Sequence, residues 1–320
     1  MSQIASFEHL LNTRRLQMFV KLCEVRHMPS VGSALGISQP AISLGVKNLE
    51  RGVGAVLFER STRGLLPTRQ ALAIEPNCRR ALKQLSFIPA EVAVLRGSLE
   101  GVVNIGVIPS GRHLILPDAI AEIATRHASL QIVTWENSLE KLISGLCAGD
   151  IDFIFGPLLL SDNKNQLEAE ELLEEDLALL VGKKNPLLKR RIVLKDLPNV
   201  RWILPGIGAP ARLLLNSVFM NAGLRPPAPI VESEDLTIIR GLLARTDMVA
   251  ALLSHQMATE IAEGRIKRLP NLFHDTVSKI GFIYHAENSP SPAAMILMDA
   301  IRQFTKIQQT KQFSERLLSS

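Results

Sequence analysis

The chain has 320 residues, 47% of them hydrophobic, which is enough for two or three domains with sizeable cores. Residues 1–100 carry 13 basic and 7 acidic side chains, whereas residues 101–320 carry 23 basic and 24 acidic ones. The excess positive charge therefore lies in the first hundred residues, and such a charge favours phosphate binding. No apolar run is long enough to cross a bilayer and residues 1–5 do not begin a signal peptide, so we expect a cytoplasmic protein.

Three short helices are predicted first, at residues 16–23, 28–36 and 39–52. Ser38 is placed to cap the third helix, and Pro40 lies in its first turn, where a missing N–H group costs nothing. The apolar face of this helix is formed by residues at helical spacing, Ile42, Val46 and Leu49. Two helices joined by a tight turn, the second with polar side chains near its N-terminus, are typical of a helix-turn-helix that enters the DNA major groove.

Two short strands, at residues 56–60 and 64–68, follow these helices, and the polar turn between them makes a wing. A longer helical pattern then extends from about residue 69 to 98, in which Pro76 and Pro89 are expected to kink or segment the helix. We interpret this helix as a connector that pairs with a second copy of the chain. Packing into the core of the same chain is the alternative.

From Gly101 the pattern changes to an alternation of strands and helices. Strands are predicted at 102–107, 130–134, 151–155, 177–181, 201–204, 229–232 and 248–252, and helices at 114–127, 138–148, 209–222, 235–244 and 291–308. This α/β alternation predicts open, mostly parallel sheets, arranged as two lobes with a cleft. An acidic run from Glu168 to Asp176 is interpreted as a solvated surface.

Several motifs together resemble those of the LysR-type transcriptional regulators, and the resemblance covers nearly the whole chain. They are the SQPAIS stretch at 38–43, the LE pair at 49–50, the LFER stretch at 57–60, Pro67-Thr68, Ile105–Ser110 with Pro117, and Leu146–Asp152. The resemblance implies a winged helix-turn-helix DNA-binding domain at 1–69, a linker and dimerisation helix at 70–98, and an effector-binding domain at 99–308. The last would have two lobes like type 2 periplasmic binding proteins, lobe I at about 100–173 and 278–308 and lobe II at about 174–277.

The same resemblance implies a homodimer or homotetramer whose function is control of transcription by a small-molecule effector. The two-fold symmetry of such an assembly predicts binding to an interrupted inverted repeat of double-stranded DNA in a promoter. Some residues depart from the family's usual pattern. Arg26 and His27 stand where Gly-Ser is usual, Leu44 occupies a position that is commonly Arg, and Gly45 follows it inside the helix. We expect these changes to leave the fold intact, but they leave the operator sequence unpredicted.

The candidate DNA-binding residues are Ser38, Gln39, Pro40, Ser43, Leu44, Lys47, Arg51, Arg60 and Arg63. Gln39 suits bidentate hydrogen bonding to adenine, and Ser43 suits several base edges. The four basic residues are expected to hold phosphates, which fixes the register without recognising sequence. An ion pair with Glu59 or Glu50 is the alternative role of Arg60, and Leu44 either contacts a thymine methyl or is simply exposed.

The candidate effector-binding residues follow predicted strands, and they are Ser110, Gly111, Ser138, Gly206, Ile207 and Gly208. Ligands of open α/β sheets bind at the carboxyl ends of strands, and helix N-termini attract anions. We therefore expect a negatively charged or strongly polar effector, to which Ser110 donates from one lobe and the backbone around Gly208 from the other. For Ser110, a helix-capping role is the alternative.

No catalytic residue, cofactor or metal site is expected, because the sequence shows no Ser/His/Asp constellation, phosphate loop, dinucleotide fingerprint or metal-ligand spacing. Cys23, Cys78 and Cys147 lack CxxC spacing and are interpreted as small buried hydrophobic residues. The rival classes are a two-lobed solute-binding protein or enzyme, which the predicted winged helix disfavours, and a thiol redox sensor. A redox sensor needs two cysteines in the sensing lobe, and only Cys147 lies there.

Overall fold

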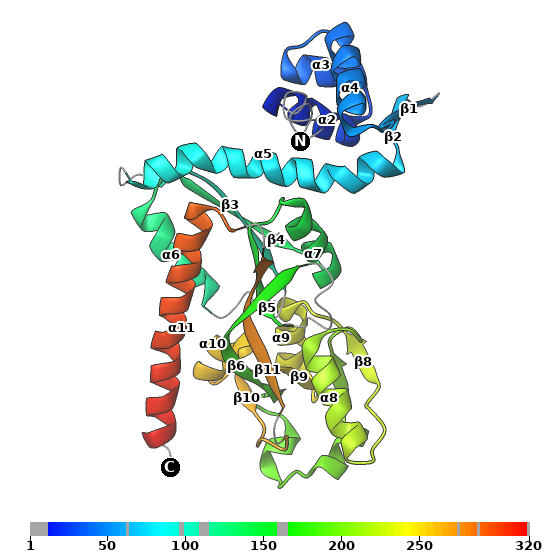
Figure 1. Cartoon of the computed structure of the whole chain (residues 1–320). Coiled ribbons are helices and arrows are strands. Elements are labelled where there is room, and N and C mark those ends of the chain that lie inside the picture. The colour runs from blue at the N-terminus through cyan, green and yellow to red at the C-terminus, as the bar shows by residue number, and fades with distance from the viewer. Residues whose placement is uncertain are drawn as a thin grey trace. The chain divides into compact units, whose positions relative to one another are not determined.

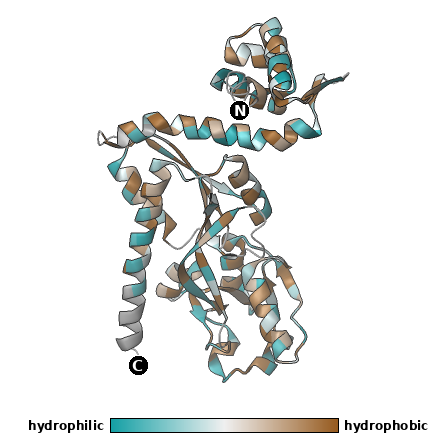
Figure 2. Cartoon of the chain, in the orientation of Figure 1, coloured by the Kyte–Doolittle hydropathy of each residue, from teal (hydrophilic) through white to brown (hydrophobic). Residues whose placement is uncertain are grey.

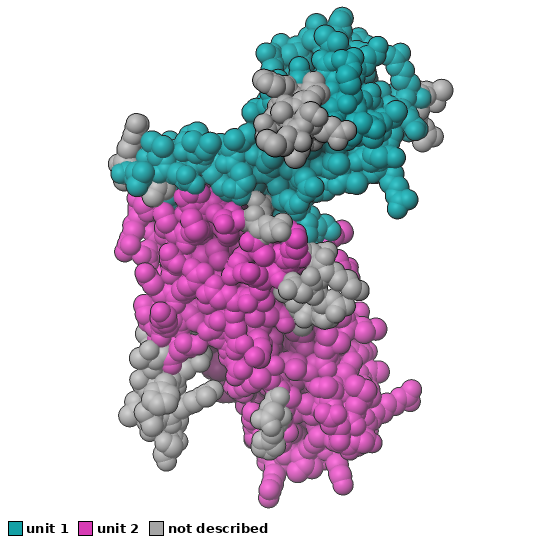
Figure 3. Space-filling view, in the orientation of Figure 1, with its two compact units in different colours: residues 1–101, 143–151 teal, residues 102–142, 152–320 magenta. Residues whose placement is uncertain are grey.

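The computed structural model describes residues 12–61, 64–95, 99–108, 115–158, 166–273, 276–286 and 289–318. The chain divides into two compact units (Figure 3), which are residues 1–101 with 143–151, and residues 102–142 with 152–320. Each unit has a hydrophobic core of its own.

The first unit begins with a three-helix domain followed by a two-stranded wing. Its elements are α2 (Thr13–Val25), α3 (Met28–Leu35), α4 (Gln39–Val53), β1 (Phe58–Ser61), β2 (Gly64–Pro67) and α5 (Arg69–Leu95), all labelled in Figure 1. The predicted helices and wing strands are therefore confirmed, with limits that differ by a few residues. Phe19 of α2 and Phe58 of β1 meet edge to face at the centre of the core, their ring centroids 5.7 Å apart.

Local hydrogen bonding explains where α4 begins and ends. Ser38 caps the helix, its Oγ accepting from the Ala41 N–H at 3.4 Å. At the other end Gly54 takes the left-handed conformation, φ +73°, that suits glycine. The Glu50 carboxylate then accepts from the N–H groups of Leu57 and Phe58, at 2.8 and 3.2 Å. These bonds hold the wing strand against the end of α4.

Two residues singled out in the sequence have unusual backbone or packing environments. Arg26 ends α2 in the left-handed region, φ +56°, a conformation that favours glycine. Gly45 allows α4 to lie directly on α2, because a Cβ at this position would lie 2.8 Å from the Met18 Sδ atom. A glycine inside a helix lowers the stability of that helix by roughly 1 kcal/mol relative to alanine, and here this cost comes with the close packing of the two helices.

Helix α5 is continuous through Pro76 and Pro89, so the expectation that these prolines divide it into segments is wrong, while the alternative of a kink stays a prediction. Each proline removes a single backbone hydrogen bond, and the first half of α5 is supported by side chains packed on the core of the three-helix domain. The packed residues of α5 are Ala71, Ile74, Cys78 and Leu82. Hydrophobic and hydrophilic residues alternate along the helix in Figure 2, as expected of an amphipathic helix.

The second unit consists of strands that alternate with helices. Its elements are β3 (Gly101–Val107), α6 (Leu116–Arg126), β4 (Leu130–Glu136), α7 (Leu139–Ala148), β5 (Phe153–Pro157), β6 (Leu167–Gly182), β7 (Trp202–Leu204), α8 (Pro210–Asn221), β8 (Pro229–Glu232), α9 (Leu236–Arg245), β9 (Val249–Leu253), α10 (Ala258–Ala262), β10 (Ile266–Arg268), β11 (Val277–His285) and α11 (Pro292–Leu318), with three short 3₁₀ helices, η1 (Pro186–Lys189), η2 (Leu194–Asn199) and η3 (Ser254–Met257). The first residue of β3, Gly101, and residues 143–151, which comprise most of α7 and the three residues after it, belong to the first unit.

The strands follow the order β4-β3-β5-β11-β6-β9-β7-β8, with β10 beside β6. Strand β6 is shared between two half-sheets. Its residues 167–176 pair with β11, and its residues 177–181 pair with β9. Strands β3 and β5 pair in parallel, as do β7 with β8 and β9, but β11 and β6 run antiparallel to their partners. The sheet is therefore mixed, and the expectation of mostly parallel sheets is wrong.

The acidic run is the first half of β6, so its interpretation as a solvated surface is wrong in part. Two of its carboxylates form ion pairs with other elements: the half-buried Glu170 with Arg302 of helix α11 at 2.6 Å, and the exposed Glu171 with Lys279 of strand β11 at 2.8 Å. The Arg302 guanidinium outweighs burial and holds the pKa of the Glu170 carboxyl below its usual range. Glu175, by contrast, is buried.

Candidate DNA-binding surface and effector pocket

Helix α4 presents opposite faces to the core and to solvent. Ile42, Val46 and Leu49 are buried in the core of the three-helix domain. The opposite side is an exposed stripe at spacings of i, i+4, i+7 and i+11, formed by Pro40, Leu44, Lys47 and Arg51. Gln39 is exposed beside this stripe and Ser43 is half-buried. The stripe has the geometry that a recognition helix needs.

Arg60 is exposed on wing strand β1. Within the described part of the chain it forms no ion pair with Glu59 or Glu50, and the Glu50 carboxylate instead accepts from the backbone. Its side chain is exposed and not paired with either glutamate, as a phosphate contact requires. Arg63, which stands between β1 and β2 in the sequence, lies outside the described residues.

A hollow of about 500 Å³ lies between the start of α2 and the N-terminal half of α4. Ser38 and Leu44 line it from one side, and Arg14 and Arg15 from the other. Sequence reasoning missed these two arginines, although a basic pair in the first turn of the first helix was the available signal. They add positive charge beside the N-terminus of α4.

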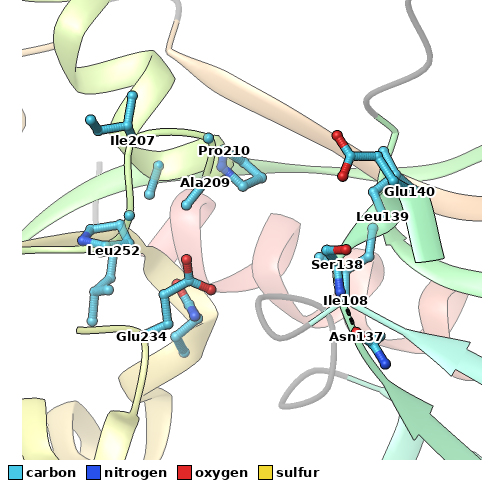
Figure 4. A pocket seen from close by; sticks show the side chains of 15 residues that line it. Ile108, Asn137, Ser138, Leu139, Glu140, Ile207, Ala209, Pro210, Glu234 and Leu252 are labelled. Atoms are coloured by element: carbon cyan, nitrogen blue, oxygen red, sulfur yellow. Dashed lines mark hydrogen bonds between the residues drawn. The ribbon is translucent and has the colours of Figure 1, made fainter. Parts of the chain in front are cut away.

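The second unit contains a pocket of about 570 Å³ (Figure 4), formed where strands of both half-sheets end. On one side it is lined by Ile108, after β3, and by the start of α7. Across from them lie residues 205–211, between β7 and α8. The lining is completed by Glu234, Leu252 of β9 and Gln256 of η3. This is where open α/β sheets bind ligands.

Four predicted effector residues lie around this one pocket, and they are Ser138, Gly206, Ile207 and Gly208. Figure 4 shows Ser138 and Ile207 on opposite sides of it. The other two predicted residues, Ser110 and Gly111, lie outside the described residues. That an effector contacts any of the six stays a prediction.

The described lining has an electrostatic character that the sequence did not predict. Its charged side chains are the carboxylates of Glu140 and Glu234, which attract hydrogen-bond donors and repel anions. Hydrogen-bond donors come instead from the backbone N–H groups that follow Pro210 in the first turn of α8, because the N-cap residue Ala209 provides no side-chain cap. The described pocket thus offers carboxylates from both sides, Glu140 of α7 and Glu234 before α9, and backbone donors at the start of α8.

A buried polar cluster fixes the position of η3, which contributes Gln256 to the pocket. The Glu175 carboxylate accepts a hydrogen bond from the Ser254 hydroxyl at 2.6 Å, and its Oε2 lies 3.4 Å from the His255 Nδ1 atom. Burial alone would raise the pKa of Glu175, but the contacts with His255 and Ser254 outweigh it and hold this pKa below the usual value of 4.5. Glu175 lies next to Asp176, the last residue of β6 that pairs with β11 before β6 begins to pair with β9.

The thiols do not have the environment of redox-active cysteines. Burial, with the Glu75 carboxylate nearby, raises the pKa of Cys23 to about 12 and that of Cys78 to about 11. Both thiols are therefore protonated at neutral pH, and a thiol is far less reactive than a thiolate. Burial also raises the pKa of the Cys147 thiol. Cys23 is buried as predicted, whereas Cys78 and Cys147 are only half-buried, so the prediction that all three are buried is wrong for these two.

Two further observations concern the described residues alone. No group of three or more His, Cys, Asp or Glu side chains among them could hold a metal ion. No helix within these ranges is long and apolar enough to span a membrane.

Comparisons with known proteins agree with this division into a DNA-binding part and a ligand-binding part. Residues 13–72 match the model of the bacterial regulatory helix-turn-helix proteins of the lysR family, and residues 96–306 match that of the LysR substrate-binding domain. The chain is 44% identical to the HTH-type transcriptional regulator GalR of Pseudomonas putida over 295 residues, and this aligned region covers 92% of this chain and 74% of GalR. It is 26% identical to GbpR of Azospirillum brasilense, covering 91% and 86% of the two chains.

Solved structures share the fold. Full-length OxyR from Pseudomonas aeruginosa matches with a TM-score of 0.68 at 22% identity, over 91% of this chain and 95% of that one. Full-length CbnR in complex with its target DNA matches with a TM-score of 0.60 at 23% identity, over 92% of this chain and 100% of the CbnR chain.

A winged helix-turn-helix joined to an α/β substrate-binding domain defines a class of DNA-binding regulators. This chain belongs to the LysR family of transcriptional regulators. It is a regulator with a DNA-binding domain and an effector-binding domain, and its curated relatives are regulators rather than enzymes.

Proposed function

We propose that this cytoplasmic regulator recognises an interrupted inverted repeat in promoter DNA by placing α4 of each of two subunits in the major groove. The observation that carries the proposal is the exposed stripe of α4, which lies opposite the buried residues that seat the helix on its own domain. The complex of CbnR with its target DNA, which shares this fold, supports it. Gln39 and Ser43 would contact base edges, while Lys47, Arg51, Arg60 and Arg63 would hold phosphates.

We further propose the domain limits that this function requires. The DNA-binding domain would occupy residues 1–69, the linker helix 70–98 and the effector domain 99–308. The exposed apolar residues of α5 support its use as the contact between subunits of a homodimer, two of which would form a homotetramer. These exposed residues are Leu72, Leu85, Ile88, Val92 and Leu95.

The effector would bind in the pocket of the second unit, in contact with Ser138 and residues 206–208, and with Ser110 and Gly111. The pocket offers carboxylates as acceptors and the backbone N–H groups at the start of α8 as donors. It therefore favours a polar effector that carries both an anionic group and hydrogen-bond donors.

Substitutions on α4 test the assignment of the recognition helix. Gln39→Ala is expected to reduce the preference for operator over random DNA by about 1–3 kcal/mol, because a bidentate base contact is lost. Lys47→Ala is expected to weaken binding to both DNAs alike and to flatten the dependence on salt, because a phosphate contact is lost. Fluorescence anisotropy titrations at several salt concentrations measure both effects. An unchanged operator preference in Gln39→Ala would contradict the assignment.

A further inference from the structure

Leu44 is an apolar side chain at the centre of the surface assigned to DNA. It is 60% exposed in the free chain. Its neighbours along the exposed stripe of α4 are Pro40 on one side, and Lys47 and Arg51 on the other. A leucine neither donates nor accepts a hydrogen bond, so in this position it can recognise DNA only through apolar contact.

The packing of α4 holds Leu44 away from the core. Ile42, Val46 and Leu49 are buried on the opposite face of the helix, so turning Leu44 inward would expose these three side chains to water. The hollow that Leu44 lines is bordered on its far side by Arg14 and Arg15, whose charged ends prefer water or phosphate. The exposure of Leu44 is thus fixed by the fold.

In the major groove, the one apolar group that the base edges present is the methyl group of thymine. We propose that Leu44 contacts the methyl group of a thymine in each half-site and makes this chain prefer thymine there. The proposal rests on the proposed role of α4 as recognition helix. Lys47 and Arg51, one and two turns further along the stripe, would hold phosphates and so fix which base pair Leu44 faces.

The experiment compares thymine with uracil, which lacks only the methyl group. The DNA is a duplex enriched from a random library by the full chain, with deoxyuridine placed at each thymine of one half-site in turn. One such replacement is expected to weaken binding about three- to fivefold, the effect of exposing one methyl-sized group. In Leu44→Ala, thymine and uracil at that position are expected to bind equally.

Two further variants sharpen the result. Leu213→Ala removes a comparably exposed leucine, 47% exposed, from α8 of the other unit and is expected to keep the preference for thymine over uracil. Leu44→Arg is expected to select guanine in place of that thymine, because arginine bonds to the O6 and N7 atoms of guanine. Unchanged thermal unfolding in each variant shows that the fold is kept.

The inference is overturned if no thymine responds to loss of its methyl group, or if the response persists in Leu44→Ala. An enriched motif whose recognition still depends on Gln39 would in that case leave the proposed function standing. If the full chain enriches no motif at all, the proposed function and this inference both fail.

Discussion

Replacing Gly281 with alanine is expected to destroy the fold of the effector-binding part of the chain. Gly281 lies in β11, where the pairing with β6 shifts register, and a Cβ there would lie 1.9 Å from the Glu170 carbonyl oxygen. This neighbour is backbone in the adjacent strand, so it can give way only by breaking the pairing. We expect a loss of about 3 kcal/mol or more, beyond the usual range for overpacking.

Both tryptophans of the chain, Trp135 and Trp202, lie in the second unit, so urea unfolding followed by tryptophan fluorescence reports on this part. Gly208→Ala is the matched control, because a Cβ at Gly208 meets no atom within 4 Å. The control is expected to unfold like the original chain. A Gly281→Ala chain as stable as the control would show that β11 and β6 do not pair as described.

The second large effect is expected from Ile42→Ala on the buried face of α4. Ile42 is fully buried in the core of the three-helix domain, so its truncation leaves a cavity and costs about 2–5 kcal/mol. That is a large part of the stability of a small domain. DNA binding is expected to be lost on mild heating, as measured by anisotropy, while the tryptophan-detected transition of the second unit is unchanged.

Leu44→Ala on the same helix is the control for this experiment. Because Leu44 is exposed, its truncation is expected to change the stability by less than about 0.5 kcal/mol. Equal destabilisation by both substitutions would mean that α4 presents a different face to the core.

The DNA-binding part could be predicted almost entirely from the sequence, because its signals are local. The Ser38 cap and the terminal glycine of α3, Gly36, are short-range devices that show up in a single sequence. The buried face of α4 follows from helical spacing alone. Arg14 and Arg15 were missed because their position beside α4 depends on the packing of α2, which spacing does not reveal.

The effector-binding part was predicted less completely, because long-range pairing decides its strands. Strand β11 was not predicted, and the acidic half of β6 resembled a surface segment, since its carboxylates are balanced by residues more than 100 positions away, Lys279 and Arg302. The pocket residues at the ends of predicted strands were found by the rule for α/β sheets. Glu234 was not predicted as a pocket residue, because its place in the pocket depends on how the connection between β8 and α9 folds back.

Recognition of a specific DNA sequence by α4 can be measured by selecting random duplex DNA with the full chain. We expect an enriched motif of two inverted half-sites, bound about 10³-fold or more tighter than random DNA at physiological salt, with the preference reduced in Gln39→Ala. Equal affinity for all duplexes, or an enriched motif that Gln39→Ala and Leu44→Arg recognise as the original chain does, would contradict it.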